Sequence, residues 1–440
     1  MIRERLERAP RALFVTYAML AAFGAYFCMY AFRKPFSVAT FENEPLISAG
    51  LAYKSALAIA QVLGYALSKF VGIKVIAELR QRYRAWLFIG LIALAELALL
   101  GFALAQGHRW NVVFLFLNGL PLGLIWGIVF SYLEGRRFTE ILGAGLSASF
   151  IVSSGAVKST GLWLMLGWGV SEFWMPFVTG AVFLLPLLFF VYLLEQIPPP
   201  SAEDIRLRTR RAPMGREERR AFFRAFAPGL FLLVAFYTLL TAFRDFRDNF
   251  AAEAWQALGF SDTPYIFTVS EIPIAVFVLL MMGATMLIQD NRRAFLMYQW
   301  LLLAGVLLVG VSTWFFQAGI LNGAIWMVLV GLGLYTAYVP VNSILFDRMI
   351  AAFRHQSNAG YLIYVADAFG YLGSVAMLLY KDFGASGLGW LNFLSGAGYV
   401  LAIVGGAAIL GAIVYFRNRY RMLDAGVLMQ PGRVGLKVEG

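Results

Sequence analysis

The sequence predicts an all-α polytopic membrane protein with twelve transmembrane helices in two pseudo-symmetric six-helix halves. The first observation is composition: 60% of the residues are hydrophobic and only 14% are charged, which excludes an ordinary soluble domain. The second is that apolar runs long enough to cross a hydrocarbon core of ~30 Å recur along the whole chain. The third is that basic residues gather in every second loop. Because lipid cannot satisfy backbone polar groups, each run is expected to be a helix.

Twelve apolar runs follow one another along the chain. The first bears Arg33 and has no convincing cleavage site, so we expect a retained helix and not a signal peptide. The predicted spans are 13–37, 51–71, 85–106, 111–133, 141–166, 173–195, 226–248, 266–288, 295–317, 320–346, 357–381 and 389–416.

The basic residues predict the orientation of the spans. Arginines cluster before the first span and after the second, fourth, eighth, tenth and twelfth, whereas the opposite loops carry little beyond Arg109 and Lys381. The positive-inside rule therefore places both termini in the cytoplasm, and we expect a multi-pass protein of the inner cell membrane. The net charge of +11 then reflects topology, and no nucleic-acid partner is expected.

The two halves of the sequence share a spacing. Three pairs of features have an offset of 211 or 212 positions: Arg33 with Arg244, Gly72 with Gly283, and segment 119–136 with segment 331–348. We therefore predict a duplicated six-helix unit, with one half at 1–196, a basic cytoplasmic linker at 197–225 and the other half at 226–440. An even number of helices gives both copies the same orientation in the membrane. Transporters built from two repeats of this kind bind substrate near the midplane, between the halves.

Arg33 and Arg244 are the first candidates for a functional site. A charge inside a span is expensive unless it faces a wet cavity or a partner. A guanidinium offers a rigid fork that fits a phosphate or carboxylate through two parallel hydrogen bonds. We expect the two arginines to face each other across a central cavity. The alternative is that each forms a structural ion pair between helices.

Several segments also match a known family. Span one contains Tyr26 and Tyr30 before Arg33-Lys34-Pro35, span two contains Tyr65-Ala-Leu-Ser-Lys69-Phe, span four contains Trp126, span ten contains Tyr338-Val-Pro, and span eleven contains Phe-Gly-Tyr371-Leu-Gly. In these segments the chain resembles the organophosphate:phosphate antiporters, the branch of the major facilitator superfamily that includes glycerol-3-phosphate, hexose-phosphate and sugar-phosphate exchangers.

The resemblance implies roles for individual residues. Arg33 and Arg244 would clamp a phosphoryl group, and Lys69 would assist them. The family's histidine in span five is replaced here by Lys158, which we include among the binding candidates. The residues that would line the cavity are Tyr26, Tyr30, Tyr65, Trp126, Tyr338 and Tyr371.

Four acids are candidates for proton or ion coupling: Asp245, Asp248, Glu271 and Asp367. Arg244 and Asp248 are four residues apart on one helical face, which predicts an ion pair within the helix. The acids leave a surplus of two positive charges when counted against the six cations of the same spans, and this surplus suits a doubly charged anion. The six cations are Arg33, Lys34, Lys69, Lys158, Arg244 and Arg247.

The sequence thus predicts a secondary transporter that exchanges a small phosphorylated organic anion for inorganic phosphate. One alternative is a proton-coupled symporter of a carboxylate or another anion, and a second is a non-transporting receptor on the same scaffold. We expect no enzymatic activity, cofactor or metal, since Cys28 and two separated histidines make no metal site and no Walker or Rossmann pattern is present. The expected partners are the substrate and the lipid bilayer, and we expect a monomer.

Overall fold

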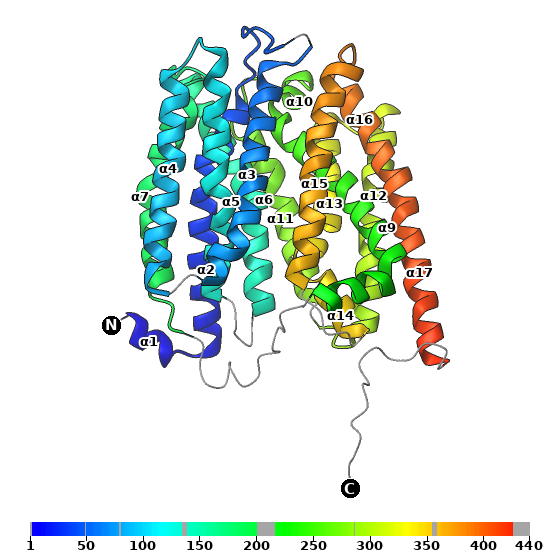
Figure 1. Cartoon of the computed structure of the whole chain (residues 1–440). Helices are drawn as coiled ribbons and strands as arrows, with labels where there is room; N and C mark the ends of the chain where they lie inside the picture. The colour runs from blue at the N-terminus through cyan, green and yellow to red at the C-terminus, as the bar shows by residue number, and fades with distance from the viewer. Residues whose placement is uncertain are drawn as a thin grey trace.

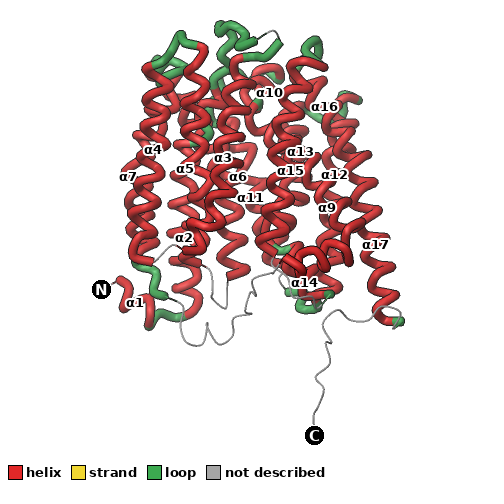
Figure 2. Tube along the Cα trace, in the orientation of Figure 1, coloured by secondary structure: helices red, strands yellow, loops and turns green. Residues whose placement is uncertain are grey.

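The computed structural model of the chain describes residues 2–48, 50–78, 81–133, 139–199, 216–285, 287–353 and 359–425. The secondary structure of this part is helical, without a named strand (Figure 2). Eleven of its helices are long and apolar enough to cross a membrane. The twelfth long helix, α3, has 26 residues and spans ~39 Å at 1.5 Å per residue, although it contains Lys54 and Lys69.

The first half contains six long helices and several short ones. Short 3-10 segments follow α2 and precede α4 and α5, where the chain turns at the ends of the spans. The elements are α1 (Ile2–Glu7), α2 (Arg11–Met29), η1 (Tyr30–Phe32), η2 (Pro35–Val38), α3 (Tyr53–Glu78), η3 (Gln81–Tyr83), α4 (Arg84–Leu104), η4 (Arg109–Asn111), α5 (Val112–Leu133), α6 (Thr139–Trp168) and α7 (Met175–Glu195).

The second half repeats this plan. Its first span, α9, begins inside the predicted linker and continues without a break through the seventh apolar run. The elements are α9 (Arg216–Asn249), α10 (Ala251–Ala257), α11 (Ile266–Thr285), α12 (Asn291–Gln317), α13 (Gly323–Ser343), α14 (Leu345–Ala352), α15 (Ala359–Leu379), η5 (Tyr380–Gly384), α16 (Trp390–Val400), η6 (Leu401–Gly405) and α17 (Gly406–Asp424). The last three form one continuous span of 35 residues.

The two halves stand side by side as bundles, with α2 to α7 in one and α9 to α17 in the other (Figure 1). Between them, α3 packs against α15 and α6 packs against α11. The second long helix of each half therefore contacts the fifth long helix of the other. This reciprocal exchange is the arrangement that two like units make around a two-fold axis along the membrane normal.

Close packing at this interface depends on a small residue. Gly155 of α6 lies directly against the backbone carbonyl of Phe267 in α11, so that a methyl group at this position would collide with it. Without a side chain at position 155, the two helices approach closely enough for backbone contact, which is the usual role of glycine between membrane helices.

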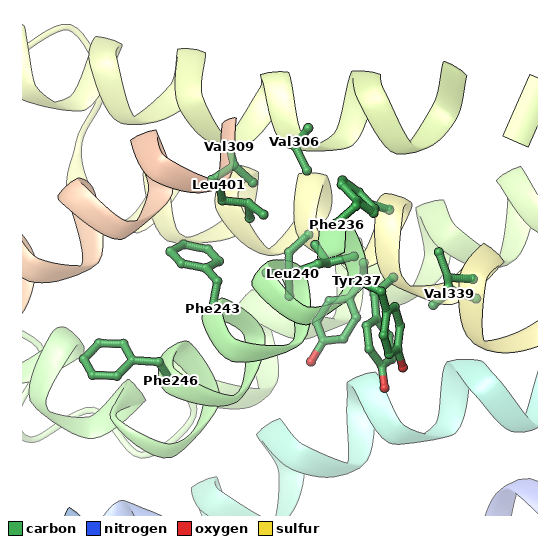
Figure 3. Close-up of a cluster of buried hydrophobic side chains, with 14 of the residues drawn as sticks. Phe236, Tyr237, Leu240, Phe243, Phe246, Val306, Val309, Val339 and Leu401 are labelled. Atoms are coloured by element: carbon green, nitrogen blue, oxygen red, sulfur yellow. The ribbon is translucent and has the colours of Figure 1, made fainter. Parts of the chain in front are cut away.

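The buried apolar side chains form two clusters: one lies almost wholly in the first half, and the larger one covers the second half and continues into part of the first. In the second half, α9 turns its apolar face toward α12, α13 and η6, and Tyr237 lies at one edge of this cluster (Figure 3). Side chains that face lipid are apolar too, so hydropathy alone does not distinguish them from side chains buried in the bundle. Which apolar side chains are buried depends on how the helices pack. The labelled residues of the cluster are Phe236, Tyr237, Leu240, Phe243, Phe246, Val306, Val309, Val339 and Leu401.

The two ends of the bundle differ. We call the end that carries α10 and α16 the distal end, and the end that carries α1 and α14 the proximal end (Figure 1). Arginines of described proximal elements, such as Arg3 and Arg5 in α1 and Arg348 in α14, lie at the proximal end, which the positive-inside rule predicts to be cytoplasmic. The expectation of a regular helix through 13–37 is wrong, because α2 ends at Met29 and Arg33 follows a 3-10 turn.

Candidate functional site

A small cavity lies between the halves, near the middle of the bundle. Its volume is about 20 Å³, which is room for one or two water molecules. Positively and negatively charged side chains meet here with aromatic ones. The lining residues are Tyr30, Arg33, Lys34, Phe150 and Ser154 from the first half, and Arg244, Asp245, Asp248 and Tyr335 from the second.

The break after α2 places Arg33 in this cavity. Unwinding frees backbone carbonyls that must find donors in a membrane. The side-chain amide of Asn118 donates to the carbonyl of Phe32 over 2.9 Å, and that of Gln61 donates to the carbonyl of Arg33 over 2.9 Å. Gln61 also donates to Asn118 over 2.8 Å. Two buried amides thus hold the chain in the shape that directs Arg33 and Lys34 between the halves.

The Arg33 side chain is the least neutralised charge of the site. Its guanidinium carbon lies 3.9 Å from the ring centroid of Tyr65 and 6.0 Å from that of Tyr30. Its Nε is buried and has no hydrogen-bond partner, and no carboxylate in the described part of the chain lies within ion-pair distance. Cation–π contact offsets part of the cost of burial, but the guanidinium keeps donors for an anion.

Arg244 is neutralised by its neighbour. Its terminal nitrogen lies 2.5 Å from Asp245 Oδ1, its Nε donates to the same oxygen over 3.1 Å, and its guanidinium carbon lies 4.0 Å from the Tyr338 ring centroid. Ser374 of α15 donates to the other Asp245 oxygen over 2.7 Å. The predicted pair of Arg244 with Asp248 is wrong, because Asp248 has partners in the other half.

Asp248 links the halves. Its two oxygens accept from different lysines, Lys34 and Lys158, each over 2.5 Å. Ser154, one turn before Lys158, donates to Asp248 Oδ1 over 2.5 Å, and Lys158 also donates to the Asp248 backbone carbonyl. Lys34 donates in addition to Asn249 Oδ1 over 2.9 Å. One carboxylate therefore serves two ammonium groups, so one positive charge remains uncompensated here.

A second cross-half ion pair lies one helical turn beyond Tyr65. Lys69 of α3 pairs with Asp367 of α15, and Tyr237 donates to the other Asp367 oxygen over 2.7 Å. The Lys69 ammonium also lies 5.3 Å from the ring centroid of Tyr371. With both oxygens satisfied, Asp367 is held as a partner of Lys69, and Lys69 is directed at Asp367 and the tyrosines rather than into the cavity.

The fourth acid, Glu271, pairs inside the second half. Arg247 donates to Glu271 Oε1 over 3.0 Å and to the carbonyl of Met327 over 3.0 Å. The second oxygen of Glu271 is buried without a hydrogen-bond partner. This pair faces α6 through the close contact at Gly155.

The predicted aromatic residues occupy different places. Tyr30 lines the cavity, and Tyr26 packs edge-on against the Tyr30 ring. Tyr65 contacts Tyr371 across the halves, with 5.7 Å between the ring centroids. Tyr338 stacks on Tyr237 at 5.5 Å and receives a hydrogen bond from Asn342. Trp126 stacks on Phe130 at 4.9 Å and is not among the residues of the cavity wall.

Sequence reasoning missed another ion pair between the halves. Lys54 Nζ lies 2.5 Å from Glu253 Oε1, and both side chains are buried. The sequence does indicate that Lys54 needs a partner, because this charged residue lies inside the predicted second span. Tyr237, Tyr335 and Ser154 were also missed, and their residue types do not distinguish them from packing residues.

The charges of these buried clusters sum to a surplus of two. Seven cations face five carboxylates, and each carboxylate has at least one cation as partner. The surplus resides at Arg33 and at the two lysines that share Asp248. Arg33, Lys34 and Asp248 line the cavity, and Lys158 reaches Asp248 from α6. The described residues contain no cluster of three or more side chains suited to a metal ion.

Three solved structures with a similar fold are named as transporters. A D-xylose-proton symporter aligns with a TM-score of 0.59 at 12% sequence identity, over 90% of this chain and 96% of that one. The peptide transporter POT, as a mutant in complex with alafosfalin, aligns with 0.59 at 15% identity, over 92% and 95%. The MFS (major facilitator superfamily) proton:xylose symporter XylE bound to 6-bromo-6-deoxy-D-glucose aligns with 0.54 at 14%, over 91% and 95%. The chain therefore has the major facilitator fold.

Sequence comparison gives a family without an activity. Residues 35–419 match the profile described as "Family of unknown function (DUF5690)". A search of the curated proteins finds no match.

Proposed function

We propose that this chain, which belongs to the DUF5690 family and has the major facilitator fold, is a secondary transporter of a small organic anion. The substrate class we propose is a phosphorylated molecule, taken up in exchange for inorganic phosphate by alternating access. The membrane is the inner cell membrane, with the proximal end in the cytoplasm. The observation that carries the proposal is the surplus positive charge at Arg33 and at the Lys34–Lys158 pair.

The charge balance supports an anion with two negative charges. A dianion between Arg33 and the two lysines would bring the sum of the buried charges to zero, whereas a neutral sugar would leave the surplus uncompensated. The guanidinium of Arg33 has donors to give, and hydrogen bonds between ionised partners are about twice as strong as neutral ones. A cationic group on the substrate would find no spare carboxylate among these buried clusters, because each of their five described carboxylates already has a cationic partner.

The two ion-pair layers support alternating access. Lys34 and Lys158 join Asp248 on the distal side of the cavity, and Lys69 joins Asp367 on the proximal side. For substrate to enter from one end, the layer at that end must separate while the other remains closed. Each layer has its lysines in the first half and its acid in the second, so separation of the halves breaks them directly.

Counterflow of labelled phosphate in proteoliposomes tests the proposal. Internal unlabelled phosphate should accelerate uptake, and phosphate esters should compete better than neutral sugars of the same size. Arg33→Gln should abolish the competition, whereas Arg292→Gln, which removes an exposed arginine paired with Asp424, should leave it unchanged. Uptake that is indifferent to every anion, or equal for both variants, would exclude an anion site at Arg33.

A proton-coupled symporter is the second candidate. The buried free oxygen of Glu271 favours it, because intramembrane carboxyls serve as proton relays in transporters. Two of the structurally similar proteins are named as proton symporters. Proton influx recorded with a pH dye during anion uptake separates the two functions: a signal that depends on the anion and disappears in Glu271→Gln selects the symporter over the exchanger.

A further inference from the structure

A further polar layer, distinct from the layer of Lys34, Lys158 and Asp248, closes the distal end outside the cavity. Lys54, near the first turn of α3, reaches Glu253 of α10 over 2.5 Å and donates to the backbone carbonyl of Ser37 over 2.8 Å. The backbone N–H of Ala52, just before α3, donates to Asp382 Oδ2 over 3.0 Å. The contacts of Lys54 with Glu253 and of Ala52 with Asp382 join the first half to the second, and they lie distal to Lys34 and Asp248.

Glu253 is incompletely satisfied in this layer. It is only 6% exposed, and while Oε1 accepts from Lys54, the buried Oε2 has no hydrogen-bond partner. An ionised carboxylate carries charge on both oxygens, so an oxygen buried without a donor is costly. When the halves separate at this end, water reaches both oxygens and the cost disappears.

The groups around Glu253 can be named element by element. Lys54 faces it from α3, and Lys158 contributes positive charge from α6. Asp248 of α9 stands five positions earlier in the sequence and is paired with Lys34 and Lys158. The neighbouring η2 presents only the Ser37 carbonyl to Lys54, and neither η2 nor α16 contains a charged side chain.

Burial and Lys54 act on this carboxyl in opposite directions. Burial raises the pKa of Glu253 above its usual value, and the positive charge and hydrogen bond of Lys54 offset only part of the rise. Glu253 lies between the seventh and eighth spans, in α10. Its carboxyl therefore holds a proton more tightly in the closed arrangement than in contact with water, where the ordinary value of about 4.3 applies.

We propose that Glu253 is a proton-binding site that stabilises closure of the distal end, with the proton on Oε2 while Oε1 keeps the hydrogen bond from Lys54. The ligand is the proton of the medium at the distal end. Because the closed state has the higher pKa, closure is strengthened as the pH falls through that pKa toward about 4.3 and is weakened as the pH rises. External acid thus closes the distal entrance.

The inference uses the alternating access of the proposed function but not its substrate. Its test therefore needs no substrate, and anion counterflow can fail or succeed independently of it. A distance between two labels across the distal end reports closure directly. Ser48 and Ser386 are both exposed in distal loops, one in each half, so cysteines at these positions can carry spin labels in a Cys28→Ala background.

Double electron–electron resonance on labelled protein in lipid nanodiscs, between pH 8 and pH 5, is the experiment. In the otherwise unchanged protein the longer-distance population should shrink as the pH falls. Glu253→Gln, which resembles the protonated side chain, should show a mostly short distance at every pH. Glu42→Gln, a change of an exposed carboxylate in the same distal region, should keep the full pH response and is the matched control.

A second variant protects the test from a folding defect in Glu253→Gln. Lys54→Gln removes the positive charge that lowers the Glu253 pKa, so the midpoint of the distance change should move to higher pH. The proposal is overturned if the distances do not respond to pH, if Glu253→Gln retains the response, or if Lys54→Gln moves the midpoint downward.

Discussion

Asp248→Asn is the sharpest perturbation of the central site. The substitution preserves the size of the side chain but removes the one negative charge that both Lys34 and Lys158 contact over 2.5 Å. The lysine side chains are only 6% and 4% exposed, so water cannot replace the carboxylate. Two buried ammonium groups would then face each other without a counter-ion.

The expected cost follows from this burial. Removing one partner of a buried ion pair costs about 3–5 kcal/mol, because the other charge stays buried and unpaired. The cost falls on the arrangement in which the halves are closed, since separation lets water reach the lysines. At about 1.4 kcal/mol per power of ten, the ratio of distal-open to distal-closed molecules should rise by roughly two to three and a half powers of ten.

The assay is the same distal distance measurement, at constant pH and with no anion present. Asp424→Asn is the control: its pair with Arg292 has a similar N–O distance of 2.7 Å, but both side chains are at least 43% exposed, and such pairs contribute about 0–1 kcal/mol. Asp248→Glu should retain most of the closed population. If Asp248→Asn opens the protein no more than Asp424→Asn does, the lysines are not held by Asp248 and the distal layer is misassigned.

Three further predictions concern the function. Arg33→Lys should weaken phosphate binding by about 10- to 100-fold, since lysine cannot form the bidentate contact. Arg244→Lys should weaken it less, because Asp245 already occupies that guanidinium. Equilibrium binding of phosphate to purified protein measures both effects, and a larger loss in Arg244→Lys would contradict the structure. Glu271→Gln and Asp367→Asn should leave phosphate exchange intact, as measured by counterflow at equal pH on both sides. Collapse of uptake driven by a pH gradient while that exchange persists would instead point to proton coupling, since exchange needs no net movement of protons. A cysteine at Ala212 in a cysteine-free background should resist an impermeant reagent added to intact cells, and rapid labelling would reverse the predicted orientation.

Hydropathy and charge patterns were sufficient for the fold. The spans follow from runs of apolar residues, and the reciprocal contacts of α3 with α15 and of α6 with α11 agree with the repeat of 211 positions. The structure also places Arg33 and Arg244 in one cavity. A charge inside an apolar run is a strong signal, because lipid penalises it at any site that lacks a compensating partner.

The pairing of the charges could not be predicted. The helical spacing that favours Arg244 with Asp248 is local, whereas Asp248 pairs with two lysines of the other half, one of which, Lys34, is more than 200 positions away. The break before Arg33 is equally hidden, because its stability comes from the amides of Gln61 and Asn118 on other helices. Sequence spacing describes one helix at a time, and these contacts depend on how helices from both halves meet.

The distribution of charge between the halves has a physical consequence. Every described ion pair across the interface has its lysine in the first half and its acid in the second, as in Lys54–Glu253 and Lys69–Asp367. The second half neutralises its own arginines, as Arg244 with Asp245 shows. When either end opens, the first half is therefore left positive and the second negative. An incoming anion is therefore attracted to the first half, at Arg33. The acids of the second half pair with their lysines again only when the halves close. The anion would thus bind to one half before closure, so substitutions of first-half cations should change affinity more than substitutions of second-half cations do.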